Sequence, residues 1–128
     1  MINIAILGFG VVGSGVADVI AENADSLSER LYGEKLNVKH ILDLRDFPEH
    51  PLGDRVTKDF DTILNDEEVL IVVETMGGSH PAYDFSKKAL EKGKSVVTSN
   101  KELVAAKGDI LLKLAEENNA NFMFEASV

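Results

Sequence analysis

Three glycines close to the amino terminus have the spacing GxGxxG, with Gly8, Gly10 and Gly13 at the fixed positions. They follow the apolar segment 2–7 and precede apolar residues at helical spacing, which is the context in which this motif binds a dinucleotide. The first glycine would permit a tight turn, the second would let the backbone approach a pyrophosphate, and the third would let helix and strand pack closely. A helix beginning here would offer unpaired N–H groups to phosphates. The order of strand, glycines and helix favours a phosphate-binding loop over a glycine-rich turn without a ligand.

A carboxylate and a guanidinium stand where the second strand is expected to end, at Asp43 and Arg45. In dinucleotide-binding folds, an acidic residue roughly 20 positions after the glycines accepts hydrogen bonds from the ribose of NAD. Asp43 comes later in the chain, which an extended first crossover would explain. An arginine can instead pair with the 2′-phosphate of NADP. The alternative for Arg45, and still more for the neighbouring Asp46, is a solvated Arg–Asp pair at a turn. Arg45 favours NADP slightly, and NAD stays open.

Small and polar residues follow two further apolar segments, 69–73 and 95–97. The residues concerned are Thr75, Met76, Gly77, Thr98, Ser99 and Lys101. Open α/β sheets bind ligands at the carboxyl ends of their strands, so we expect both groups to line a cleft for a nicotinamide ring. Lys101 could place an ammonium beside a reacting oxygen or a substrate carboxylate. The alternative is a solvated lysine in the first turn of a helix, where the helix dipole disfavours a cation.

Metal chemistry has one candidate residue. Glu125 follows an apolar segment, and its carboxylate together with main-chain carbonyls could hold a hard cation through oxygen ligands. The alternative for Glu125 is a solvent-facing position at the end of a strand. The histidines His40, His50 and His80 share no metal-ligand spacing, so we interpret them as structural or surface residues.

The elements that must position these residues alternate along the chain. Strands are expected at residues 2–7, 37–44, 69–75, 95–98 and 121–125. Helices are expected at residues 12–27, 59–65, 79–92 and 100–115. Ser79 would cap the third helix with Pro81 in its first turn, and Gly108 would interrupt the fourth. Residues 45–58 fit neither period and are interpreted as a connection.

Five strands separated by helices predict an α/β fold with a doubly wound, mostly parallel sheet of the Rossmann type and helices on both faces. A chain of 128 residues fits one domain, so we expect residues 1–128 to form a single nucleotide-binding domain. The last strand has a core-like composition and is followed by only a few residues. We therefore expect the chain to be the front part of a longer protein.

Composition excludes several classes of function. The formal net charge of -9 would repel a phosphate backbone, so nucleic acids are poor partners. Apolar runs are far shorter than the roughly 20 residues of a membrane span, which argues against a membrane protein. The sequence has no cysteine and no recognisable export signal, and both observations fit a cytoplasmic protein.

Four segments resemble one family, the amino-terminal NAD(P)-binding domain of homoserine dehydrogenase. They are GFGVVGSGV at 8–16, VETMGG at 73–78, ALEKGKSVVTSNKELVA at 89–105 and FEASV at 124–128. The glycine motif is generic, whereas VVTSNKELVA together with FEASV is specific to this family and its near relatives. The resemblance covers the chain from end to end.

The resemblance implies a reversible hydride transfer between NAD(P)H and L-aspartate 4-semialdehyde, giving L-homoserine, in threonine and methionine biosynthesis. It implies that Lys101 is the active-site lysine and that Arg45 approximates the arginine that binds the 2′-phosphate. Residues lining the cofactor would be Phe9, Gly10, Val11 and Val12. Glu125 and the main chain of Val128 match the start of a sodium site. The full-length protein would be a homodimer or homotetramer.

Two departures from the family pattern bear on these expectations. Ser99 stands where the family often has alanine, and Asp43 with Leu44 alters the approach to Arg45, which affects the choice between NAD and NADP. The family's substrate and dimerisation domain, with a second catalytic lysine, lies outside this sequence, so we expect the isolated domain to be inactive. The alternatives are a non-catalytic dinucleotide-sensing module and another NAD(P)-dependent amino-acid dehydrogenase.

Overall fold

The computed structural model describes residues 1–30, 32–78 and 80–124, which contain one six-stranded sheet. The strands are β1 (Ile2–Leu7), β2 (Leu36–Leu42), β3 (Val56–Thr57), β4 (Val69–Glu74), β5 (Ser95–Thr98) and β6 (Phe122–Phe124). Their order across the sheet is β3-β2-β1-β4-β5-β6, and every pair is parallel. This is the strand order of the Rossmann fold, in which the chain reverses direction across the sheet between β1 and β4. The predicted fold class is confirmed.

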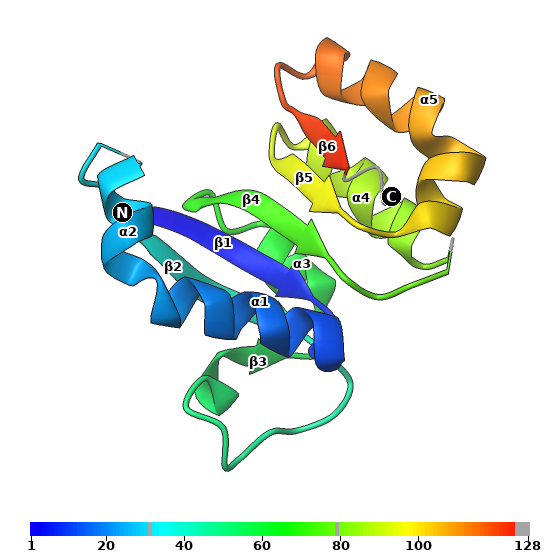
Figure 1. Cartoon of the computed structure of the whole chain (residues 1–128). Coiled ribbons are helices and arrows are strands. Elements are labelled where there is room, and N and C mark those ends of the chain that lie inside the picture. The colour runs from blue at the N-terminus through cyan, green and yellow to red at the C-terminus, as the bar shows by residue number, and fades with distance from the viewer. Residues whose placement is uncertain (31, 79, 125–128) are drawn as a thin grey trace.

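Helices cover both faces of this sheet. They are α1 (Val11–Glu22), α2 (Ala24–Arg30), α3 (Phe60–Leu64), α4 (Ala82–Glu91) and α5 (Lys101–Glu117), with a short 3-10 turn η1 (Gly53–Arg55). In Figure 1, α1 lies in front of the sheet and α3 and α4 lie behind it, while α5 packs beside α4 and β6. Within the described residues, no helix has the length and apolar character needed to cross a bilayer.

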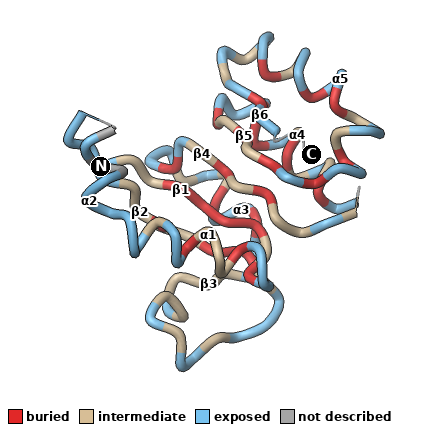
Figure 2. The backbone as a smooth tube through the Cα atoms, in the orientation of Figure 1, coloured by how far each residue is buried: buried red, intermediate tan, exposed pale blue. Residues whose placement is uncertain are grey.

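The central strand β1 is buried on both faces, which explains why its residues are nearly all apolar. Ile4 and Ile6 belong to the core on the α1 face, together with Ala17 of α1. Ala5 and Leu7 point the opposite way, into the larger core formed with α3, α4 and α5. Figure 2 shows this continuous buried stretch running along β1 toward the start of α1. The glycine motif thus begins at the end of the most deeply buried strand.

Two helices replace the single helix expected over residues 12–27. α1 ends at Glu22 with Asn23 as its C-cap. The Asn23 main-chain N–H still makes the helical hydrogen bond to the Val19 carbonyl at 3.0 Å, and its side-chain amide donates to the same carbonyl at 2.9 Å. A side-chain amide that binds a helix carbonyl in this way competes with continuation of the helix. α2 then begins at Ala24 and extends to Arg30, into the segment expected to be irregular.

The helix α5 is continuous through Gly108, where an interruption was expected. Gly108 is buried, and the nearest atom to a β-carbon built there would be a Val104 methyl at 3.4 Å. A glycine inside a helix costs about 1 kcal/mol. Burial of Leu103, Leu111 and Ala115 along the same helix outweighs that cost. Pro81 is the N-cap of α4 rather than a first-turn residue, and Ser79 lies outside the described residues.

The segment 45–58 holds more structure than a plain connection. Besides η1 it contains β3, in which Val56 and Thr57 pair with Ile41 and Leu42 of β2. The sheet therefore has six strands instead of the five expected. β2 ends at Leu42, two residues earlier than expected, because Asp43 leaves the strand and directs its side chain to the glycine turn.

Candidate dinucleotide-binding site

The glycine turn joins β1 to α1 at the carboxyl edge of the sheet. Gly8 has a φ of +92°, which a residue with a side chain rarely adopts. A β-carbon at Gly13 would overlap the Gly8 carbonyl oxygen, so α1 can approach the turn only because residue 13 is glycine. Gly10 is the N-cap of α1, no described side chain caps this helix, and its first turn holds no acidic residue. The helix start therefore keeps amide groups available for an anion.

Thr75 fixes the turn from the neighbouring strand end. Its main-chain N–H donates to the Leu7 carbonyl at 3.0 Å, and its hydroxyl lies within hydrogen-bond distance of the carbonyls of Leu7 (2.8 Å) and Gly8 (2.9 Å). A hydroxyl carries one proton, so it donates to one of these carbonyls at a time or is shared between them. The ends of β1 and β4 are thereby held together at the reversal point of the sheet.

Asp43 links the end of β2 to the same turn. Its Oδ2 accepts a hydrogen bond from the Phe9 N–H at 2.9 Å. Both of its oxygens accept from the Arg45 guanidinium at 3.0 Å, and Oδ1 also accepts from the Arg45 main-chain N–H at 2.9 Å. The Arg45 side-chain hydrogen bonds lower the pKa of the Asp43 carboxyl to about 2, against a smaller opposing effect of burial. Asp43 thus stays ionised at neutral pH and holds Arg45 in place.

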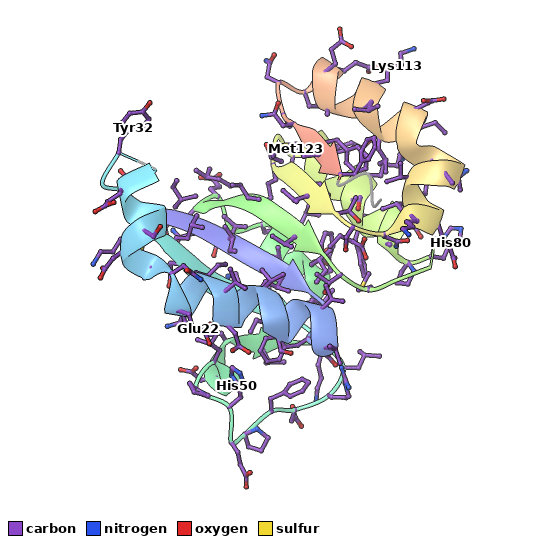
Figure 3. The ribbon with its side chains drawn as sticks, in the orientation of Figure 1. Glu22, Tyr32, His50, His80, Lys113 and Met123 are labelled. Atoms are coloured by element: carbon purple, nitrogen blue, oxygen red, sulfur yellow. The ribbon has the colours of Figure 1, made fainter. Side chains whose placement is uncertain are left out.

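The Phe9 side chain packs into the core on the α1 face of the sheet. It is buried, and its ring packs edge-on against Phe47 (centroids 5.1 Å apart) and His50 (4.8 Å). Figure 3 shows His50 in the loop below α1. Its Nδ1 accepts a hydrogen bond from the Leu52 N–H at 3.0 Å, so His50 has a structural role, as the sequence predicted. The loop after β2 therefore anchors the glycine turn from below.

A cavity of about 580 Å³ opens between the glycine turn and the segment after β2. Of the residues predicted to bind a cofactor, it is lined by Gly8, Phe9, Gly10, Arg45, Thr75 and Met76. Sequence reasoning missed Lys58, which lines the same cavity. Its Nζ lies 3.3 Å from Asp46 Oδ1. Sequence reasoning also missed the apolar residues Leu42, Pro81 and Phe85 of the same lining. No motif marks these four residues, because only the fold brings them to the cavity.

A second cavity, of about 340 Å³, lies on the other side of Thr75. Of the predicted residues, it is lined by Val12, Thr75, Gly77, Ser99 and Lys101. Lys101 is the first residue of α5 and is exposed. Gly78, Asn100 and Glu102 complete the lining. The two cavities share Thr75, so they adjoin at the end of β4.

The remaining predicted site residues lie elsewhere. Val11 sits in the first turn of α1 with 91% of its surface exposed, and Gly13 is buried beneath the turn. Thr98 is buried, and its hydroxyl donates to Glu74 at 2.6 Å. Glu125 and Val128, the residues predicted for a sodium site, lie outside the described residues.

Comparisons with known proteins point to one family. A family model described as the NAD-binding domain of homoserine dehydrogenase matches residues 8–125. The homoserine dehydrogenase of Lactococcus lactis is 40% identical over 133 residues, which cover 99% of this chain and 31% of that protein. A crystal structure of S. aureus homoserine dehydrogenase at pH 7.0 superposes with a TM-score of 0.87 at 41% identity, covering 98% of this chain and 32% of the other.

A more distant structure is that of a hyperthermophilic archaeal homoserine dehydrogenase in complex with NADPH. It superposes with a TM-score of 0.78 at 32% identity and covers 99% of this chain and 44% of the other. The chain spans about a third of the length of the Lactococcus lactis and S. aureus proteins.

Proposed function

Because the chain belongs to the NAD-binding domain family of homoserine dehydrogenase, we propose that it binds NADP or NAD at the glycine turn. There it would supply the cofactor half of a reversible hydride transfer between L-aspartate 4-semialdehyde and L-homoserine. The observation that carries the proposal is the uncapped start of α1, set behind Gly8, whose φ is +92°, and Gly13, where a β-carbon would overlap the Gly8 carbonyl oxygen. Its amides and the positive end of the helix dipole would hold the pyrophosphate. The net charge of -9 does not oppose this, because a dipole at contact distance outweighs screened charges farther away.

The hydrogen bonds of Asp43 support NADP as the preferred cofactor. An ionised carboxylate has about four lone-pair positions. Each oxygen of Asp43 already accepts two hydrogen bonds, so none is left for the hydroxyls of a ribose. Arg45 uses two of its N–H groups on Asp43 and keeps the others for a phosphate. Lys58 adds a second cation to the same cavity.

Lys101 supports the proposed chemistry at the second cavity. When bound, the nicotinamide ring supplies or accepts the hydride. Lys101 lines the cavity with the Gly77–Gly78 loop, and its ammonium can donate a hydrogen bond to the substrate oxygen that gains negative charge. The N-terminal dipole of α5 acts in the same direction on a developing negative charge.

We further propose that turnover needs substrate-binding groups outside these 128 residues. Hydride transfer requires the reacting carbon atoms of the substrate and of the nicotinamide ring to be held about 3–3.5 Å apart. On the family resemblance we also propose a homodimer or homotetramer in the cytoplasm. A sodium ion at Glu125 and Val128 stays a prediction of that resemblance.

Calorimetric titration with NADPH and NADH, combined with a turnover assay, tests the proposal. We expect saturable binding of both cofactors to the 128-residue chain, with NADPH binding more tightly. The product of the complete gene should reduce L-aspartate 4-semialdehyde. An absence of saturable heat with correctly folded protein would contradict the binding site. Binding without turnover by the complete gene product would favour a dinucleotide-sensing module. Turnover of a different amino acid or amino alcohol would point to another NAD(P)-dependent dehydrogenase.

A further inference from the structure

A fully buried carboxyl group lies beneath the two loops that border the smaller cavity. Glu74 is the last residue of β4 and has no exposed surface. It is paired in the sheet with Thr98, the last residue of β5. Its Oε1 accepts a hydrogen bond from the Thr98 hydroxyl and its Oε2 accepts one from the Met76 N–H, both at 2.6 Å. Among the described residues, none of the ion pairs involves Glu74.

The hydrogen bonds continue from Thr98 to the start of α5. The Thr98 hydroxyl oxygen accepts from the Asn100 N–H at 2.9 Å. The Asn100 side chain then caps α5, since its Oδ1 accepts from the Leu103 N–H at 3.1 Å. The Asn100 amide nitrogen donates to the Gly78 carbonyl. Glu74 is therefore connected both to the loop after β4 and to the residue that precedes Lys101.

A carboxyl group at this position is costly if it serves only to fill space. Burying such a group without a cation is unfavourable even when it is hydrogen-bonded, and apolar side chains of similar volume would pack the same space at lower cost. Apolar packing has no direction, however, whereas hydrogen bonds in series fix the orientation of each group they join. In this network every donor and acceptor belongs to one of the two strand ends or to the loops that follow them.

We propose that Glu74 is a positioning residue for the hydride transfer. Acting through Thr98 and Asn100, it orients Lys101 and the loop from Met76 to Gly78 relative to one another. This inference rests on the proposed function, because it assigns a role to residues around the proposed reaction site. It predicts that breaking the network lowers turnover far more than cofactor affinity, which depends mainly on the glycine turn.

The test uses the product of the complete gene and a small set of variants. Thr98→Val removes the hydroxyl at nearly constant volume, whereas Thr98→Ser keeps the hydroxyl and removes only the methyl group. Glu74→Gln keeps the shape of the side chain but replaces one carboxylate oxygen with an NH2 group. That NH2 group would face a donor, either the Thr98 hydroxyl or the Met76 N–H, both of which donate to Glu74 in the parent protein. The matched control is Ser86→Ala, because Ser86 is equally buried and its hydroxyl has no partner among the described residues. For each variant, kcat, the Kd of NADPH, the melting temperature and amide hydrogen exchange in peptides spanning 74–78 and 98–103 are measured.

We expect Thr98→Val and Glu74→Gln to lower kcat by about 10- to 100-fold, the range that a misplaced reacting group produces. The Kd of NADPH should stay within about twofold, and exchange should rise in both peptides because the network holds the Met76 and Asn100 amides. Thr98→Ser should retain most of the parent turnover, and Ser86→Ala should match the parent protein in kcat, NADPH affinity and exchange. The double variant Glu74→Gln/Thr98→Val should be no slower than the worse single variant, since both break the same connection.

Two results would overturn the inference. One is a Thr98→Val protein whose kcat equals that of the parent although exchange in the peptides has risen. The other is a parallel loss of kcat, NADPH affinity and melting temperature, which would make the network part of the general core. If the parent protein binds NADPH but does not reduce the semialdehyde, the proposed function fails instead. The exchange data would then still report whether the network joins the two loops.

Discussion

The guanidinium of Arg45 is held by the carboxylate of Asp43 through two hydrogen bonds of 3.0 Å, on the same carboxylate that binds the Phe9 amide. A β-carbon at Gly10 would lie 3.9 Å from Arg45 Nη2, so the guanidinium stands directly beside the glycine turn. The glycine turn and the residue proposed to bind the 2′-phosphate thus form one unit. A change in either residue of the pair should alter cofactor choice before it alters the fold.

Replacement of Arg45 tests this relationship. In Arg45→Ala, the 2′-phosphate of NADP loses a charge-assisted partner, and the Kd of NADP should rise about 10- to 100-fold, as expected for hydrogen bonds to a charged group. The Kd of NAD should change little or fall, because Asp43 regains lone pairs for the ribose hydroxyls. Titration calorimetry with the two cofactors measures both values, and NAD serves as the control that lacks only the phosphate. An equal loss for both cofactors would reject the assignment of Arg45.

The two glycines that flank Ser14 should respond in opposite ways to the same substitution. In Gly13→Ala, the new methyl group would overlap the Gly8 carbonyl oxygen, so either the helix or the turn must move. We expect a loss of about 1–3 kcal/mol in the free energy of unfolding, together with weaker cofactor binding. In Gly15→Ala, no heavy atom other than those of the adjacent residues and the helix's own backbone lies within 4 Å of the new β-carbon, and alanine favours the helix by about 0.5–1 kcal/mol. Urea unfolding curves separate the two effects, and equal midpoints for the two variants would contradict the close packing at Gly13.

Local patterns in the sequence were sufficient for the elements that carry the motifs. The apolar runs that form β1, β4 and β5 each lie close to their predicted ranges, and Asn100 caps α5 as expected. In each case the signal is short-range: a buried strand needs consecutive apolar residues, and a cap needs a polar side chain before a helix. The apolar patterns at residues 69–75 and 95–98 therefore predicted where β4 and β5 end. They also predicted the position of the loops that follow these strands and border the smaller cavity.

Features that depend on distant pairing were not predictable in the same way. β3 is two residues long and is a strand only because β2 lies beside it. Lys58 reaches the larger cavity through that pairing, although it belongs to no motif. In the sequence, Glu74 is indistinguishable from any acidic residue at the end of a strand. Its burial follows from the pairing of β4 with β5. Contacts between residues far apart in sequence set these features, and no local period contains them.

Lys101 should affect catalysis far more than cofactor binding. In Lys101→Ala, the ammonium beside the smaller cavity is removed, and turnover by the complete gene product should fall at least about 100-fold, as when one stabilising donor of a reacting oxygen is lost. The Kd of NADPH should stay within about threefold, a difference of less than about 0.7 kcal/mol. Lys113→Ala is the matched control, because Lys113 is an exposed lysine farther along the same helix, as Figure 3 shows. An unchanged rate for Lys101→Ala would remove this residue from the mechanism.

The stability of the protein in acid should depend on Asp66, a carboxylate in the segment between α3 and β4. Asp66 Oδ2 lies 2.8 Å from both Lys39 Nζ and His40 Nε2. The hydrogen bond from Lys39 is the main cause that lowers the pKa of Asp66 to about 2, below the value of 3.8 expected in the unfolded chain. The folded state therefore binds fewer protons than the unfolded state between these two values, and stability rises with pH across that window. The contribution is complete above about pH 5 and is lost as the pH falls through about 2.

In Asp66→Asn, we expect the free energy of unfolding to fall by about 1–2 kcal/mol at pH 7, less than the full pKa difference would give because Lys39 is partly exposed. The deficit relative to the parent protein should shrink toward pH 2, where the parent also loses this ion pair. Asp46→Asn is the control: Asp46 and Lys58 are both mostly exposed, so breaking their pair should cost less than about 0.5 kcal/mol at any pH. Urea unfolding at pH 7, 4 and 2.5 measures the three proteins. A deficit for Asp66→Asn that is as large at pH 2.5 as at pH 7 would show that its effect does not come from the charge, because at pH 2.5 the parent should have lost part of the same interaction.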